Sequence, residues 1–234
     1  MVSRKIEKDK YGPGWGEVIF GAVLSLVLGA ALALGYLVVK PVVPVDRLPK
    51  EPAAGTVYYV AGSNKTDSGK QWMRKKELLT EGSSVTVNED DLNAWIADET
   101  APPAPAAPAP GQKPAAKPAA GSASLIELGT PNFRIHDGLL QIGSKGTLNI
   151  DAWGVKQAIF VQVAGRFEKH SGGFVFAPDE FYIGSCPLHR VPGLGGFVLD
   201  RLLAKVKAPD DIAAAWKKLA DVSIEGKELK LTMP

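Results

Sequence analysis

Residues 18–39 read VIFGAVLSLVLGAALALGYLVV, a run of 22 residues without a charged side chain. At about 1.5 Å of rise per residue, a helix of this length covers about 33 Å, enough to cross a hydrocarbon core of about 30 Å. The run is apolar on every side, whereas a helix that packs on a soluble core is apolar on one side. It therefore predicts a transmembrane helix, with the remaining chain on one side of a membrane.

A cleaved signal peptide is the main alternative for this run, because Ala31, Leu32 and Ala33 resemble the small-residue site of a signal peptidase. The apolar run continues for six residues beyond Ala33, and its full length exceeds an ordinary signal-peptide core. We therefore favour an uncleaved anchor, with cleavage after Ala33 as the alternative.

Basic residues on the two sides of the run favour one orientation. They are Arg4, Lys5, Lys8 and Lys10 before the run, and Lys40, Arg47 and Lys50 after it. Because cytoplasmic flanks carry an excess of Lys and Arg, residues 1–17 are predicted to be a cytoplasmic tail. The chain is then expected to be a single-pass protein, most simply of a bacterial inner membrane, with its C-terminal part outside the cytoplasm.

The segment after the run is rich in proline and leads into one globular domain. Its prolines are Pro41, Pro44, Pro49 and Pro52. Since proline fixes φ and cannot continue a helix, residues 40–55 are predicted to form a stiff stalk. Residues 56–234 have the length of one domain. The formal net charge of +2 excludes a strongly basic surface, so no nucleic-acid partner is expected. A single cysteine, Cys186, excludes an internal disulfide.

A strand and two helices are predicted in residues 56–100. The strand is TVYYV at 56–60, rich in β-branched and aromatic residues, and the first helix covers 70–81. Asn88 is a good N-cap for the second helix, whose first turn carries three acids. These are Glu89, Asp90 and Asp91. Adjacent helix residues point in different directions, so the acids predict capping rather than a metal site.

Residues 101–123, APPAPAAPAPGQKPAAKPAAGSA, are of low complexity and lack the apolar side chains of a core. They predict a disordered segment, either a loop inserted in one domain or a spacer between two parts. We favour the loop, because residues 51–100 contain too little apolar material to fold alone.

The C-terminal half predicts strands followed by helices and a final hairpin. An Asp137-Gly138 turn is expected to join strands at 133–136 and 139–142. Further strands are expected at 146–153, 157–169, 174–176 and 180–185. Helices are expected at 194–206 and 209–220, and a hairpin at 222–231. This order predicts an α+β fold, a curved antiparallel β-sheet packed with two to four short helices.

No catalytic or metal-binding constellation is evident in the sequence. Cys186 and His189 are three residues apart, but a Cys–His nucleophile needs a lowered thiol pKa and an orienting third group. Two ligands are also too few for a zinc site. We therefore expect no enzyme, no metal and no cofactor, and keep a Cys186–His189 hydrolase only as a minor alternative.

Three short motifs resemble those of known proteins. They are VTVNEDDLNAWI at 85–96, FYIGSCPL at 181–188 and the closing V-x-I-x-G-x-x-L-x-L hairpin at 222–231. Their order resembles that of uncharacterised bacterial single-pass envelope proteins and is loosely similar to domains of the tubular lipid-binding type. The resemblance implies a curved antiparallel sheet around an apolar groove, and it assigns no site residue.

These observations predict a membrane-anchored, non-enzymatic binding module of a bacterial envelope, whose ligand is a lipid or an apolar segment of a partner. The side chains expected to line a groove for it are Leu194, Phe197, Val198, Leu202 and Trp216, although all five also suit an ordinary core. The alternative is a structural subunit of an envelope assembly, with residues 101–123 as spacer. The expected partners are the membrane and either a lipid or an envelope protein, and the oligomeric state stays open.

Overall fold

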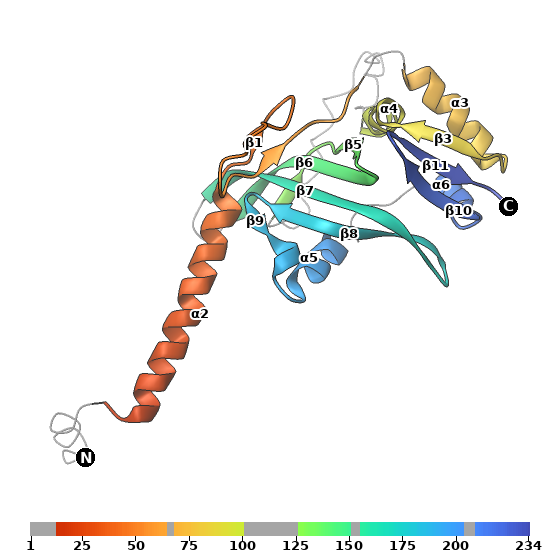
Figure 1. Cartoon of the computed structure of the whole chain (residues 1–234). Helices are drawn as coiled ribbons and strands as arrows, with labels where there is room; N and C mark the ends of the chain where they lie inside the picture. The colour runs from red at the N-terminus through yellow and green to blue at the C-terminus, as the bar shows by residue number, and fades with distance from the viewer. Residues whose placement is uncertain (1–12, 65–67, 101–125, 151–154, 204–208) are drawn as a thin grey trace, which may run out of the picture.

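The computed structural model describes residues 13–64, 68–100, 126–150, 155–203 and 209–234, and its N-terminal part is a single long helix (Figure 1). This helix, α2, covers Trp15–Val39, and no residue in it is fully buried. Among the described residues it is the one helix long and apolar enough to cross a membrane, properties that a signal sequence near an N-terminus shares. It ends before Pro41, which cannot continue the helical hydrogen bonds.

After α2 the chain folds back onto the domain instead of extending as a stalk. Strand β1 (Val43–Pro44) pairs in parallel with β2 (Tyr58–Tyr59). The Val45 amide donates to Tyr59 O at 2.9 Å, and Lys40 Nζ donates to Gly55 O at 2.6 Å. We call residues 43–60 the strap. The expected stalk over residues 40–55 therefore lies largely within the strap.

The main sheet has six strands and is antiparallel. It contains β4 (Ile126–Leu128), β5 (Asn132–His136), β6 (Leu139–Ile150), β7 (Val155–His170), β8 (Gly173–Ile183) and β9 (Cys186–Pro187). Their order is β4-β6-β7-β8-β9, with β5 also paired to β6. Asp137 and Gly138 join β5 to β6 with φ of 51° and 73°, which confirms the predicted hairpin. A register shift at Ala164 and Gly165 lets β8 continue through the two predicted strands as one.

A second antiparallel sheet joins the two ends of the domain. It contains β3 (Val85–Asn88), β10 (Asp221–Glu225) and β11 (Glu228–Thr232), in the order β10-β11-β3. The predicted C-terminal hairpin is thus confirmed, but its second strand pairs with β3 and not with the main sheet. The strands divide among three sheets where one sheet was expected, because local sequence patterns specify strands without specifying their partners.

The described residues contain five further helical segments, which surround the sheets. They are α3 (Ser68–Thr80), α4 (Glu89–Thr100), the 3-10 turn η2 (Leu188–Arg190), α5 (Leu194–Leu203) and α6 (Asp210–Trp216). Asn88 caps α4 as predicted: its Oδ1 accepts from the Asp91 amide at 2.9 Å, and Asp91 Oδ2 accepts from the Asn88 amide at 3.0 Å. The buried Asp91 carboxylate also pairs with Lys75 Nζ at 2.5 Å, which ties α3 to α4.

Two apolar clusters form the core. One fills the space between α3, α4, α6, the three-stranded sheet and the end of the main sheet that carries Ile135, Leu140 and Phe174. The other lies between the main sheet and α5, and contains Ile159, Val161 and Phe181. The molecule is therefore an α+β fold with an N-terminal apolar helix, antiparallel sheets and several helices, as the sequence predicts in outline.

The last turn of α2 is fixed to the turn between β8 and β9. Gly184 has φ +58°, and a Cβ at this position would lie 2.0 Å from Val38 O. The Ser185 amide donates to Leu37 O at 2.9 Å. Leu37 and Val38 pack against the cluster beneath the main sheet. The Gly184-Ser185 pair of the FYIGSCPL motif therefore lets the helix backbone approach the sheet.

Candidate ligand-binding cleft

The two faces of the main sheet differ in polarity. Residues paired across antiparallel strands lie on one face, so Gln141, Ala164 and Glu180 form one row with Arg134. The next row on that face joins Gly143, Gln162 and Tyr182. The opposite face carries the apolar residues of the cluster that α5 covers. One face of the sheet is thus core, and the other is a polar surface.

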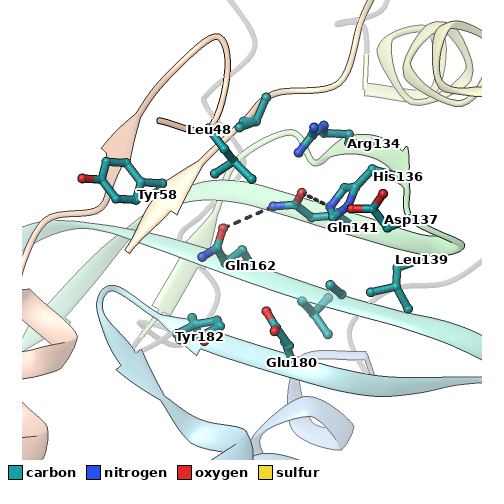
Figure 2. A pocket seen from close by; sticks show the side chains of 13 residues that line it. Leu48, Tyr58, Arg134, His136, Asp137, Leu139, Gln141, Gln162, Glu180 and Tyr182 are labelled. Carbon is teal, nitrogen blue, oxygen red and sulfur yellow. Dashed lines mark hydrogen bonds and ion pairs between the residues drawn. The ribbon is translucent and has the colours of Figure 1, made fainter. Parts of the chain in front are cut away.

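The strap covers part of the polar face and leaves a cleft beside itself. The cleft has a volume of about 320 Å³. Figure 2 shows side chains of the strap and of β5 to β8 converging on it. The lining residues are Leu48, Tyr58, Val60, Arg134, His136, Asp137, Leu139, Gln141, Gln162, Val163, Ala164, Glu180 and Tyr182.

Two buried glutamines form the floor of the cleft. Gln141 and Gln162 are only 8% and 6% exposed. Gln141 Nε2 donates to Gln162 Oε1 at 3.3 Å, and His136 Nε2 lies 3.1 Å from Gln141 Oε1, which accepts its proton (Figure 2). The Nε2 amino group of Gln162 takes no part in these two contacts. The floor therefore offers amide N–H groups that a ligand can engage.

The rim of the cleft carries both signs of charge and two tyrosines. Arg134 and the carboxylates of Asp137 and Glu180 all line the cleft (Figure 2). Burial raises the pKa of Tyr182, with Glu180 adding to the effect and Arg190 opposing it. Tyr182 therefore stays a neutral hydroxyl group at ordinary pH. Mixed charge at the rim favours a neutral or zwitterionic ligand over a strongly charged one.

Tyr59 fixes the strap to the sheet. Its hydroxyl donates to Asn132 Oδ1 at 2.8 Å, and its ring lies 4.2 Å from the ring of Phe160. A Cβ at Gly143 would lie 2.3 Å from the Tyr59 ring, so only glycine leaves room for the ring over β6. Burial raises the pKa of Tyr59 to about 12. The wall of the cleft is therefore a packed part of the domain.

Asn93 of the LNAW motif supports the same region from α4. It is 2% exposed, and its side-chain amide pairs with both the N–H (2.7 Å) and the carbonyl (2.8 Å) of Phe133 on β5. It also accepts from Asn132 Nδ2 at 3.0 Å and donates to Ser63 O at 2.9 Å. The Asn93 side chain thus makes the two backbone hydrogen bonds at Phe133 that a neighbouring strand would make at the outer edge of β5.

The structure separates the five residues predicted to line an apolar groove. Leu194, Val198 and Leu202 on α5 pack against the cluster beneath the main sheet, while Phe197 on the same helix is 69% exposed. Trp216 belongs to the other cluster, where its Nε1 donates to Phe174 O at 2.8 Å. Trp216 is therefore not brought together with the four α5 residues, and a ligand-binding role for the set stays a prediction.

Cys186 and His189 show no sign of a nucleophile and base pair. Cys186 is fully buried, and burial raises the pKa of its thiol. His189 Nδ1 lies 3.2 Å from the backbone N and O of Phe181, and no hydrogen bond joins it to Cys186, although the structure describes both residues. The described parts of the chain also contain no group of three His, Cys, Asp or Glu residues placed to bind a metal.

The cleft was missed in the sequence because its parts are ordinary residues. Alternation places Gln162 on the face of β7 opposite Val161 and Val163, but it does not show what covers that face. The one available signal is a pair of amides, Gln141 and Gln162, each with small or apolar residues as its immediate neighbours along the strand. The strap was expected as a stalk and therefore not as a wall.

Comparison with known proteins finds no match for this chain. No protein-family model matches the chain, no curated protein matches it, and no solved structure matches it. The resemblance to bacterial single-pass envelope proteins and to tubular lipid-binding domains therefore stays a prediction from three short motifs.

Proposed function

We propose that this protein is a single-pass, membrane-anchored binding module of a bacterial envelope, with its α+β domain outside the cytoplasm. The cleft between the strap and the polar face of the main sheet is the observation on which this function rests. As a binding module the protein is non-enzymatic, and the ligand occupies the cleft without covalent chemistry.

Several features of α2 support a membrane span. Trp15 and Tyr36 are 84% and 65% exposed near its two ends. They are 21 residues apart, about 32 Å at 1.5 Å per residue, which matches the aromatic belts at the two surfaces of a bilayer. The Lys and Arg residues before the helix support a cytoplasmic N-terminus.

The position of the cleft supports a ligand from outside the membrane. In Figure 1 the strap lies on one side of the main sheet, while α2 runs away from the other side, where α5 also lies. With α2 in a bilayer, the cleft opens away from the lipid. A ligand is then taken from the space outside the cytoplasm, or from a polymer in that space.

The chemistry of the cleft favours a polar ligand over the lipid chain expected from the sequence. An apolar ligand would leave the N–H groups of the buried Gln162 amide facing apolar atoms, at a cost of about 1–3 kcal/mol. A ligand with amide and hydroxyl groups satisfies them. A volume of about 320 Å³ is at the lower end of ligand pockets, so the ligand is one small unit and its binding is weak.

The test uses the full chain in detergent micelles and N-acetylglucosamine as the probe, because this sugar has both an amide and hydroxyl groups. Saturation-transfer NMR is expected to show binding to the wild type. Gln162→Leu removes the floor amide, Ala164→Leu fills the cleft, and both should abolish the signal. Gln157→Leu, an exposed glutamine on the same strand, is the matched control and should keep it.

Absence of saturation transfer from the wild-type protein to the sugar, or an equal signal from the two cleft variants and the control, would show that the cleft is not the binding site. The structural-subunit alternative would then be preferred. Its own support is the fixed contact between α2 and the β8–β9 turn, which suits a rigid element of an assembly.

A further inference from the structure

Phe197 has an unusual environment for a large apolar side chain. It is 69% exposed on α5, and it is the one exposed aromatic residue among the described residues that follow α2. Its neighbours on α5 are buried to a greater extent: Leu199 is 7% exposed, and Leu194, Val198 and Leu202 pack against the core. α5 thus has one face in the core and an aromatic residue on its outer face.

The position of α5 shows what can cover Phe197. The inner face of α5 and the last turns of α2 pack against the same apolar cluster, to which α2 contributes Leu34, Leu37 and Val38. Figure 1 shows α5 beneath the main sheet, on the side toward which α2 runs. α5 is therefore the helix of the domain that lies beside the C-terminal end of α2, where a membrane span would leave the bilayer.

The length of α2 places this exit at the surface of the bilayer. A hydrocarbon core of about 30 Å takes about 20 helical residues, so a span that begins at Val18 ends at about Leu37. The Leu37 carbonyl accepts from the Ser185 amide, which belongs to the turn before β9 and η2. The turn and the adjacent α5 are therefore at the level where acyl chains meet the headgroups.

We propose that α5 docks on the lipid surface beside α2, with Phe197 inserted into the interface. The domain then has two contacts with the bilayer, the span and α5. α5 has only ten residues and would not bind a bilayer alone, but the span keeps it at a high effective concentration next to the lipid. This inference rests on the membrane placement of α2 proposed above and is independent of the ligand of the cleft.

The test places a nitroxide label at single positions of the full chain in vesicles of phosphatidylethanolamine and phosphatidylglycerol. Cys186 is fully buried and stays unlabelled. Phe197→Cys is the test position, Val175→Cys on the distant end of β8 is the exposed control, and Leu28→Cys on α2 reports on the span. Power saturation compares the collision rates of each label with oxygen, which enters lipid, and with a nickel chelate, which stays in water.

The label at position 197 should show an oxygen-to-nickel ratio several-fold above that at position 175 and below that at position 28. A ratio equal to that at position 175, with the label at position 28 in lipid, would overturn the α5 contact alone. A label at position 28 that is accessible to nickel would overturn the span. Spin–spin broadening at position 197 that persists on dilution with lipid would show a second copy of the chain there, and would also overturn the proposal.

Discussion

Replacement of Gly184 by alanine tests the contact between α2 and the domain. A Cβ at Gly184 would lie 2.0 Å from Val38 O, which is backbone and cannot rotate away. Gly226 in the β10–β11 turn has nearly the same φ, +61° against +58°, but nothing lies within 4 Å of its Cβ position. Gly226→Ala is therefore a matched control that has the left-handed backbone cost, about 1–2 kcal/mol, without the clash.

The expected excess for Gly184→Ala follows from what the clash displaces. The Ser185 amide loses its bond to Leu37 O, worth about 1 kcal/mol. Leu37 and Val38 lose part of their packing on the cluster, worth about 1–2 kcal/mol for two half-buried side chains. Gly184→Ala should therefore be about 2–3 kcal/mol less stable than Gly226→Ala.

Two measurements on the full chain in micelles check this expectation. Urea unfolding followed by tryptophan fluorescence gives the difference in the free energy of unfolding between the two variants. Hydrogen exchange at the Ser185 amide gives the local effect, and about 2 kcal/mol corresponds to roughly thirtyfold faster exchange in Gly184→Ala. Equal destabilisation of the two variants, with wild-type exchange at Ser185, would refute the docking of α2 against this turn.

Two further predictions concern stability. Burial raises the pKa of Tyr59 to about 12 in the folded protein, whereas the unfolded chain loses this phenol proton near pH 10. Between pH 10 and 12 the folded state therefore binds one proton more than the unfolded state. The free energy of unfolding should fall by up to about 2.7 kcal/mol over this range. Lys75→Met leaves the buried Asp91 carboxylate without its ion pair and should cost about 3 kcal/mol, whereas Lys76→Met breaks only the exposed pair with Asp211 and should cost less than about 0.5 kcal/mol.

Urea unfolding of the full chain measures both effects, with Tyr59→Phe as the reference for the first. The same loss of stability between pH 10 and 12 in Tyr59→Phe as in the wild type would show that another group is responsible. Equal costs for Lys75→Met and Lys76→Met would show that Asp91 does not depend on Lys75.

Elements with a strong local cause were predictable from the sequence. The apolar run specified α2, the Asp137-Gly138 pair specified a hairpin whose two turn residues both have positive φ, and Asn88 specified the start of α4. Each depends on interactions within a few residues, so the chain around it is sufficient to determine it.

Features that depend on distant residues were not predictable. β11 pairs with β3 about 140 residues earlier, a partnership that no local pattern encodes. The prolines after α2 stop the helix but do not decide whether the chain extends or folds back. Folding back requires that Tyr59 fit over Gly143 on another strand, and the cleft exists only because of that contact.

The strap and the β8–β9 turn are both attached to the C-terminal end of α2. Ser185 Oγ donates to Lys40 O at 3.3 Å, and three residues separate the end of α2 from β1. One wall of the cleft is thus joined to the same helix end as the β8–β9 turn, which closely follows Tyr182 at the rim of the cleft. A span changes its tilt when the thickness of the bilayer changes. If α2 spans a bilayer as proposed, a change of its tilt is therefore expected to move the strap relative to the sheet and to change the width of the cleft.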